Sequence, residues 1–455
     1  MDYTHQRIGG PGTKEAYQLA YGTGPDSPEN KNVNPELFPT EKVIGGRDFL
    51  GESFVHTAES LESDAIPDGN PIDANRHGTM VADAILTVAP QTQLIAYKVC
   101  TSDTGTCPGF SVLSALEYAL DPNQDDNMDD KVDIVNLSLG GSYLSSYYDL
   151  RTEAMEQVFQ LGVLPVVAAG NEGNIPFIGG PGAKTPNAIS VAATNGWASG
   201  VHSFVASYSS RGPGDENVLK PDISAPSGLT LAAFGTGSEL FRDVQGTSFA
   251  APVVAGSLAL IKERCPSCSP FTLKAILMNN AKRQVQYRTR DTPISAQPTD
   301  DAPNSLVGAG EVQLAKALDS DVWAYCVEDV QPSLSFGLIN AHKDTTFKKT
   351  IRVINLSGSE QTLRPRNQFS QKALSEPQEN PLILSFSPEE QLLPAECNSY
   401  VEFEVTFTVD ASKAPPNRMT SGGLASNDPA NNDWNEFGGW VIIENVSTGK
   451  DISLP

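Results

Sequence analysis

The stretch VLPVVAAGNEGN (residues 163–174) decides the fold class of this 455-residue chain. Its first half is apolar, and its second half is a short polar turn. A strand that is apolar throughout, rather than at every second position, is buried on both faces, which is typical of a parallel sheet covered by helices. Comparable apolar runs occur at LIAYKV (94–99), VDIVNLSLG (132–140) and AISVAAT (188–194).

Helix-like stretches separate these runs, at residues 111–120 and 149–162. Two more follow at 248–264 and 271–282, and the polar, proline-containing segment from Arg283 to Asn304 indicates a loop. Strands that alternate with helices predict an α/β domain, in which a three-layer arrangement places helices on both faces of a parallel sheet.

The hydrophobic period changes after about Cys326. In YVEFEVTFTV (400–409) apolar and polar residues alternate, and strands are also expected within TFKKTIRVIN (346–355) and GGWVIIEN (438–445). A period of two indicates half-buried antiparallel strands. We therefore predict an α/β domain over residues 1–325 and an all-β sandwich over 326–455.

Acidic residues dominate the charge of the chain. Lysine and arginine number 31 against 55 aspartates and glutamates, which gives a formal net charge of -24. With no basic cluster, nucleic acid and anionic lipid are disfavoured as partners. No stretch approaches the roughly 18 consecutive apolar residues of a membrane span, so we expect a soluble chain that does not bind a membrane.

The six cysteines are an even number, and two pairs are close enough in sequence to close short loops. Disulfides are therefore plausible at Cys100/Cys107 and Cys265/Cys268. The CPSC motif could instead suggest zinc, but no second pair stands at finger-like spacing, so a metal is the weaker interpretation.

The stretch QGTSFAAPVVAG (245–256) places Ser248 at the start of a predicted helix. Free N–H groups and a partial positive charge there suit a serine whose attack creates an oxyanion. The alternative is an N-cap serine, which is commoner in proteins. The small residues Ala250, Ala251 and Gly256 favour a helix that approaches a neighbour closely.

Three other polar positions lie at strand ends or at the beginning of a helix. His77 in NRHGTMVADAIL opens a predicted helix, and Asn171 in VVAAGNEGN could donate a hydrogen bond to the same oxyanion. Alone, each is more often structural. Residues after the strand in VNLSLGG could pair with an extended peptide, although a core strand that ends at a glycine turn explains this segment equally well.

In this order, HGT, SLGG, AAGNEG and GTSFAAP resemble the motifs of the subtilisin-like serine proteases, and SYSSRGP, KPDISAP and GAGEVQLAKAL resemble the family's flanking signatures. The resemblance covers about residues 1–320. It implies Ser248 as nucleophile, His77 as general base, and Asn171 with the Ser248 N–H as oxyanion donors. The substrate-binding residues expected from it are Ser138, Leu139, Gly140, Ala168, Ala169 and Gly170.

The family's catalytic aspartate stands on the first strand, in a stretch like DTGIDYTH. Because this chain begins with MDYTH, Asp2 matches the second aspartate of that stretch, and we expect the triad carboxylate before Met1. A secreted subtilase would also carry a signal peptide upstream. Asp48 and Asp73 match other, non-catalytic family positions. The chain as given is therefore expected to be nearly inactive.

The loop DPNQDDNMDDKVD (121–133) carries oxygen side chains on alternate residues. It resembles acidic calcium loops of some subtilases, although it fails the EF-hand template, and a solvated acidic loop is an equal alternative. No cofactor is expected to be required, and Ca²⁺ is expected only as a structural ion. Its predicted ligands are Asp121, Asn123, Asp125, Asn127 and Asp129.

The tail resembles the fibronectin-like β domain that follows the protease domain in larger subtilases. Asn355 and Asn445 lie in sequons that could carry glycans, whereas the sequon at Asn136 falls in a buried strand. The leading functional hypothesis is a secreted endopeptidase that hydrolyses extended polypeptides through an acyl-enzyme. The alternative is a non-catalytic, subtilase-like binding protein. Serine carboxyl peptidases fit poorly, because HGT supplies a histidine.

Overall fold

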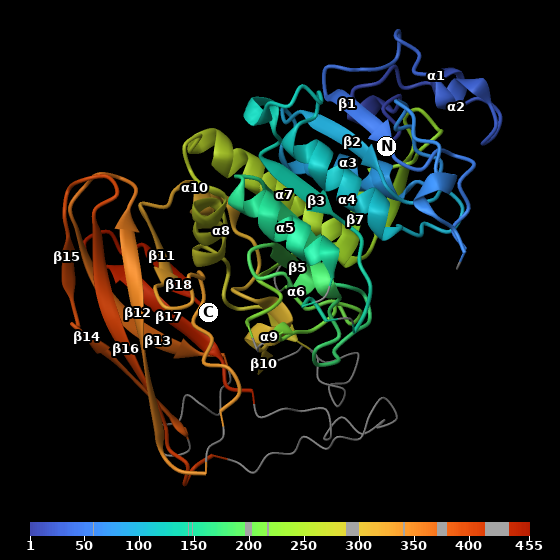
Figure 1. The fold of residues 1–455 in the computed structure, drawn as a ribbon. Helices are drawn as coiled ribbons and strands as arrows, with labels where there is room; N and C mark the ends of the chain where they lie inside the picture. The colour runs from blue at the N-terminus through green and yellow to red at the C-terminus, as the bar shows by residue number, and fades with distance from the viewer. Residues whose placement is uncertain are drawn as a thin grey trace.

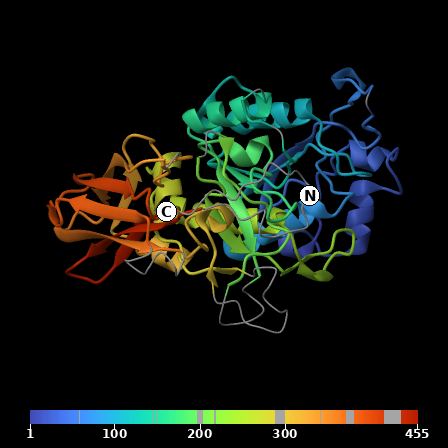
Figure 2. The ribbon, with the colours of Figure 1, turned by 90° about the horizontal axis from the view of Figure 1, so that it is seen from below.

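The computed structural model of the protein describes residues 1–57, 59–143, 145–147, 149–195, 203–215, 218–287, 300–339, 342–370, 380–414 and 436–455. Figure 1 shows an α/β domain beside a β sandwich, and the view in Figure 2 separates the two parts clearly. None of the helices within these described residues is long and apolar enough to cross a lipid bilayer.

The main sheet of the first domain consists of four parallel strands in the order β3-β4-β5-β6. Two further strands form a separate parallel pair near the N-terminus. These six strands span Val43–Asp48 (β1), Leu94–Lys98 (β2), Ile134–Leu137 (β3), Leu164–Ala168 (β4), Ile189–Thr194 (β5) and Ile223–Pro226 (β6). The predicted strand runs thus form strands, and the parallel arrangement is confirmed.

Helices cover both faces of the main sheet. They span Lys14–Tyr21 (α1), Pro28–Lys31 (α2), His77–Val88 (α3), Gly109–Leu120 (α4), Leu150–Gln160 (α5), Pro181–Lys184 (α6), Thr247–Arg264 (α7), Pro270–Asn279 (α8), Asn304–Val307 (α9) and Leu314–Leu318 (α10). Val166 and Ala168 of β4 pack in the same apolar cluster as α7, whereas Val167 packs with Met155 and Val158 of α5. Every residue of β4 is therefore buried, as its uninterrupted apolar sequence predicts.

Pairs of short strands lie outside the main sheet of this domain. Strands β7 (Leu229–Ala232) and β8 (Leu240–Val244) pair antiparallel, as do β9 (Gln286–Tyr287) and β10 (Asp300–Asp301). The segment from Arg283 to Asn304 was predicted to be a loop, but β9 and β10 lie within it, and residues 288–299 are outside the described part. Pairs this short carry no periodicity that a sequence could reveal.

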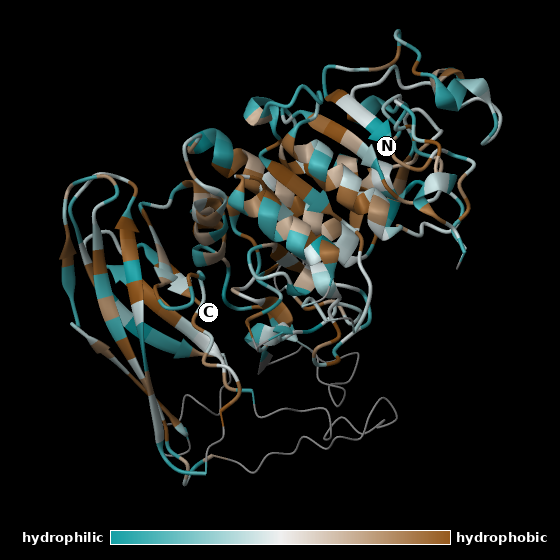
Figure 3. Ribbon diagram, in the orientation of Figure 1, coloured by the Kyte–Doolittle hydropathy of each residue, from teal (hydrophilic) through white to brown (hydrophobic). Residues whose placement is uncertain are grey.

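The second part is a sandwich of two four-stranded antiparallel sheets, in the orders β11-β12-β16-β14 and β15-β13-β17-β18. Alternate residues along its long strands pack in apolar clusters between the sheets, and Figure 3 shows the corresponding bands of brown and teal. The strands span Val322–Cys326 (β11), Thr345–Asn355 (β12), Gln361–Phe369 (β13), Leu382–Ser387 (β14), Gln391–Leu393 (β15), Tyr400–Val409 (β16), Gly439–Asn445 (β17) and Asp451–Leu454 (β18).

The sandwich begins earlier than the sequence indicates and packs tightly on the first domain. Strand β11 starts at Val322, ahead of the predicted boundary at 326. Asn279 of α8 accepts a hydrogen bond from the Ala324 N–H at 2.7 Å and donates one to the Ser453 carbonyl at 3.3 Å. The indole N–H of Trp440 donates to the Ala309 carbonyl at 2.9 Å. Buried polar contacts therefore join the two domains.

The two predicted disulfides are formed, between Cys100 and Cys107 and between Cys265 and Cys268, which removes the CPSC thiols as zinc ligands. The folded structure disfavours the glycans that the sequons at Asn355 and Asn445 would allow. Both side chains are buried, and their amides donate to Pro394 and Gln361 respectively, so neither nitrogen is accessible. A sequon reports sequence only, and here both asparagines end strands inside the sandwich.

Candidate active site

Helices α3 and α7 bring His77 and Ser248 to the same edge of the main sheet. His77 is the first residue of α3 and Ser248 the second of α7. The helices touch at Gly256, where an added Cβ would lie 2.9 Å from the Ile85 carbonyl oxygen and from the Val88 side chain. The predicted close approach of α7 to a neighbour is confirmed. The ring centroids of His77 and Phe249 are 5.5 Å apart, so the imidazole lies beside the residue that follows Ser248.

Ser248 does not cap its helix through its side chain. The N-cap of α7 is Gly246, whose φ of 143° lies in a region that side chains avoid, and no side chain accepts a capping hydrogen bond. The Ser248 hydroxyl instead points to the Ser138 carbonyl at 3.4 Å, while the Ser138 hydroxyl donates to the Ser248 carbonyl at 2.7 Å. The alternative interpretation of Ser248 as an N-cap is therefore wrong.

Asn171 is held by the residue before Ser248. Its Oδ1 accepts hydrogen bonds from the Thr247 N–H at 2.9 Å and from the Thr247 hydroxyl at 3.0 Å. Among the described residues no partner is found for Asn171 Nδ2, so the amide N–H groups remain available to an oxyanion. Thr247 was missed from the sequence, where it stands only as the middle letter of GTS.

The predicted substrate segments continue two neighbouring strands. Ser138, Leu139 and Gly140 follow β3, whereas Ala168 is the last residue of β4 and is followed by Ala169 and Gly170. Because Leu137 pairs with Val167 in parallel register, these segments leave the same edge of the sheet. Gly140 is exposed, and a Cβ added to it would meet no atom within 4 Å. Ala168 and Ala169 are buried, so the open part of this edge lies on the β3 side, at Gly140.

The imidazole of His77 is held in a half-buried position. Burial lowers the pKa of His77 from its usual 6.5, and the negative charge of Asp73 acts in the opposite direction. The ring is therefore mostly neutral near pH 7, which is the form that accepts a proton.

The aspartates near this histidine are engaged elsewhere. Both oxygens of Asp73 accept hydrogen bonds at the start of α3, from Asn75, Arg76 and Thr79. Asp2 accepts from the Thr4 hydroxyl and from the Gly235 N–H. In the part of the chain that the structure describes, neither carboxylate forms a hydrogen bond with the imidazole.

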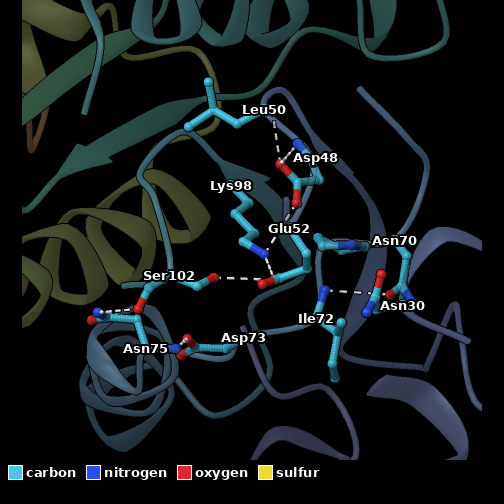
Figure 4. Close-up of polar contacts among 12 residues, drawn as sticks. Asn30, Asp48, Leu50, Glu52, Asn70, Ile72, Asp73, Asn75, Lys98 and Ser102 are labelled. Carbon is cyan, nitrogen blue, oxygen red and sulfur yellow. Dashed lines mark hydrogen bonds and ion pairs between the residues drawn. The ribbon is translucent and has the colours of Figure 1, made fainter. Parts of the chain in front are cut away.

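Asp48 belongs to a separate buried cluster, drawn in Figure 4. It accepts hydrogen bonds from the Leu50 and Gly51 N–H groups and pairs with Lys98 at 3.0 Å, and Lys98 also pairs with Glu52. Burial lowers the pKa of Lys98, although Asp48 opposes this shift. Asp48 thus neutralises a buried lysine, in line with the expectation that it is not catalytic.

The side-chain oxygens of the predicted calcium loop accept hydrogen bonds from backbone N–H groups of the same loop. Asp121 accepts hydrogen bonds from the Asp125 and Asp126 N–H groups, and Asp125 accepts one from Asn127. Asn123 and Asn127 accept in turn from Asp125 and Asp129. Among the described residues, no three His, Cys, Asp or Glu side chains are grouped to hold a metal ion. Calcium binding here stays a prediction without structural support.

The fold and site together define an α/β protein with a serine and a histidine at one edge of a parallel sheet. The model of the Subtilase family matches residues 48–310, more than half of the chain. The chain belongs to this family, as the order of its motifs predicts.

Curated relatives include the Serine protease AprX of Bacillus subtilis (strain 168), 32% identical over 271 residues, which cover 52% of this chain and 59% of that protein. Subtilisin of Bacillus sp. (strain TA39) is 34% identical over 241 residues, covering 49% and 53%. The chain thus spans little more than half the length of these relatives. Among solved structures, Sphericase is 30% identical with a TM-score of 0.45, covering 60% of this chain and 84% of that one.

Proposed function

We propose that the protein is a serine endopeptidase that hydrolyses peptide bonds of extended polypeptides. Family membership supports the reaction class. The observation that carries the proposal is the joint position of Ser248, Ser138 and Asn171, with the oxygen of Asn171 anchored on Thr247. This arrangement leaves a nucleophile, an open strand edge and an amide donor together.

In the proposed reaction a substrate segment lies along the residues after β3 and β4 as an added strand. The Ser248 hydroxyl attacks the scissile carbonyl carbon, and its proton passes to His77. The resulting oxyanion is held by Asn171 Nδ2 and the Ser248 N–H at the start of α7. The C–N bond then breaks, His77 protonates the leaving amine, and water hydrolyses the ester through the same steps in reverse order.

We propose further that this 455-residue chain turns over slowly. The described residues give His77 no hydrogen-bonded carboxylate to fix its tautomer and to stabilise the imidazolium. In subtilisin itself, loss of the triad aspartate reduces kcat by about 3 × 10⁴, a value that belongs to that enzyme and not to this chain. We therefore expect the activity that Ser248, His77 and the oxyanion donors supply without a triad aspartate.

The same proposal extends to the location of the protein, its second domain, its ions and its partners. We propose that the protein is secreted and that its sandwich is fibronectin-like, with Ca²⁺ as a structural ion and no cofactor in the reaction. Neither a nucleic acid nor a membrane is proposed as a partner, in line with the net charge of -24.

A fluorophosphonate probe tests the reaction class, because it modifies only activated serines. We expect slow labelling of the folded chain that Ser248→Ala abolishes and His77→Ala reduces. Ser257→Ala is the matched control, because Ser257 lies in the same helix with its hydroxyl bonded to the Val253 carbonyl. The absence of a hydrogen-bonded carboxylate at His77 among the described residues favours the alternative, a non-catalytic binding protein. That alternative is supported if the folded chain takes up no label but binds an extended peptide.

A further inference from the structure

A carboxylate of the sandwich contacts one buried arginine of the first domain. Arg211 donates three hydrogen bonds: from Nε to the Ser305 hydroxyl at 2.8 Å, from one terminal nitrogen to Asn174 Oδ1 at 2.9 Å, and from the other to Glu436 Oε2 at 2.6 Å. Glu436 lies just ahead of β17, in the sandwich. A single guanidinium thus joins the second domain to Asn174, which lies three residues after Asn171.

Glu436 is itself firmly docked. Its Oε1 accepts from the Ser305 N–H at 2.9 Å and its Oε2 from the Ser305 hydroxyl at 2.5 Å. Two residues later, an added Cβ on Gly438 would lie 2.4 Å from Asn304 Oδ1. The segment before β17 therefore lies tightly against α9, which restricts the position of the carboxylate.

The segment that carries Arg211 also backs the turn that carries Asn171. The Gly173 N–H donates to the Tyr208 carbonyl at 2.7 Å, the Ser210 N–H to the Gly170 carbonyl at 3.0 Å, and the Phe177 N–H to the Gly212 carbonyl at 3.1 Å. The Ser210 hydroxyl accepts from the Glu172 N–H at 3.1 Å. Residues 170–177, here called the oxyanion turn, are thus bonded along much of their length to residues 208–212.

Burial makes the Glu436 contact necessary for this arrangement. The Arg211 side chain is 7% exposed and that of Glu436 19%. Removing the carboxylate charge leaves a buried guanidinium without its anionic partner, which is strongly unfavourable, so the arginine has to move toward water. Such a movement would break the contact with Asn174 and loosen the support of the oxyanion turn.

We propose that Glu436 is a positioning residue, through which the sandwich holds Arg211 and thereby orders the oxyanion turn. This inference rests on the proposed function, because it assigns the turn a role in holding the oxyanion. It makes the second domain a part of the catalytic architecture, although no residue of the sandwich is proposed to contact the substrate.

The chain provides a matched control in a second ion pair between the domains. Asp451 of β18 pairs with Arg283 at 2.9 Å and with Lys316 of α10 at 2.6 Å. It is exposed to a similar extent, at 20%. Neither cation forms a hydrogen bond with residues 170–177 or 208–212 in the described part of the chain. Glu436→Gln and Asp451→Asn therefore each remove one interdomain negative charge, and only the first affects the oxyanion turn.

The test compares the full-length chain with these two variants. A peptidyl fluorophosphonate forms an O–P bond with Ser248 and expels fluoride, with its phosphoryl oxygen in the place of the oxyanion. We expect Glu436→Gln to lower the maximal labelling rate by about tenfold while the probe's dissociation constant stays unchanged, because orientation rather than binding is lost. Asp451→Asn should change neither quantity.

Amide hydrogen exchange provides a second measurement that does not depend on activity. The N–H groups of Glu172, Gly173 and Phe177 should exchange faster in Glu436→Gln than in Asp451→Asn or the parent chain. Equal exchange and equal labelling rates in the two variants would overturn the inference. If the parent chain shows no label that Ser248→Ala removes, the proposed function fails instead, and exchange still decides whether Glu436 orders the turn.

Discussion

Thr247 holds Asn171 by two hydrogen bonds, one from its backbone N–H and one from its hydroxyl, both to the same amide oxygen. Since that oxygen is occupied, the orientation of the amide is fixed, and its nitrogen has no hydrogen-bond partner among the described residues. The residue directly before the candidate nucleophile therefore sets the orientation of the candidate oxyanion donor.

The first prediction follows from this pair. Thr247→Val removes the hydroxyl but keeps the volume and the backbone bond, so we expect the maximal labelling rate at Ser248 to fall by about tenfold, the scale of one lost orienting hydrogen bond. Thr247→Ser, which restores the hydroxyl, should recover most of it. Equal rates for the two variants would show that the hydroxyl does not orient Asn171.

The second prediction concerns the spacing of α3 and α7. Gly256→Ala places a methyl group 2.9 Å from both Ile85 and Val88, so the helices have to separate, and we expect a loss of about 1–3 kcal/mol in unfolding free energy by urea denaturation. The helices carry His77 and Ser248, so labelling should slow as well.

Gly109→Ala is the control for that prediction. Gly109 begins α4, and an added Cβ there would meet nothing within 4 Å. We expect its unfolding free energy to stay within about 0.5 kcal/mol of the parent value. If Gly256→Ala has the same unfolding free energy as Gly109→Ala, the contact between α3 and α7 accommodates the added methyl group without strain.

The third prediction concerns pH. Because burial lowers the pKa of His77 below 6.5, the ring stays neutral to a lower pH than a free histidine. Labelling of Ser248 should therefore fall on acidification with a midpoint below pH 6.5, where the imidazolium can no longer accept a proton. A midpoint at or above 6.5 would show that charges near the ring outweigh its burial.

Much of the fold could be predicted because local sequence patterns match it. The apolar run at 163–169 is buried on both faces as β4, and the alternation at 400–409 appears as β16. The Arg211 to Glu436 contact could not be predicted, since 225 residues separate its partners and no periodicity connects them. The burial of Asn355 and Asn445 could not be predicted for a related reason: a three-residue motif does not report burial.

The fourth prediction concerns the acidic loop. Its carboxylates now accept hydrogen bonds from the loop's own N–H groups, so calcium would have to replace some of those bonds. A calcium site predicts a measurable heat of binding by titration calorimetry, a higher Tm with calcium and a lower one with chelator. Asp121→Asn should remove these effects. A chain whose Tm responds to neither calcium nor chelator has no such site.

The last prediction concerns alkaline stability and Lys220, a buried lysine of the first domain. Lys220 pairs with Asp222 at 2.6 Å and donates to the Ala188 carbonyl, while Lys274 pairs with the other oxygen of Asp222 at 2.8 Å. Two buried cations thus share one carboxylate. Burial lowers the pKa of Lys220 to about 8, with Asp222 opposing and Lys274 assisting the shift.

The lowered pKa of Lys220 determines whether the free energy of unfolding rises or falls with pH. Between pH 8 and the ordinary value of 10.5, the unfolded chain binds a proton at Lys220 that the folded chain has released, so this lysine makes stability rise with pH across that window. Across this window the rise is of the order of a few kcal/mol. Lys220→Met should remove it, and Asp222 keeps Lys274 as its partner in that variant. Urea denaturation of both chains at pH 7.5 and pH 10 measures the difference; parallel pH profiles would mean that Lys220 stays protonated in the fold, held by Asp222.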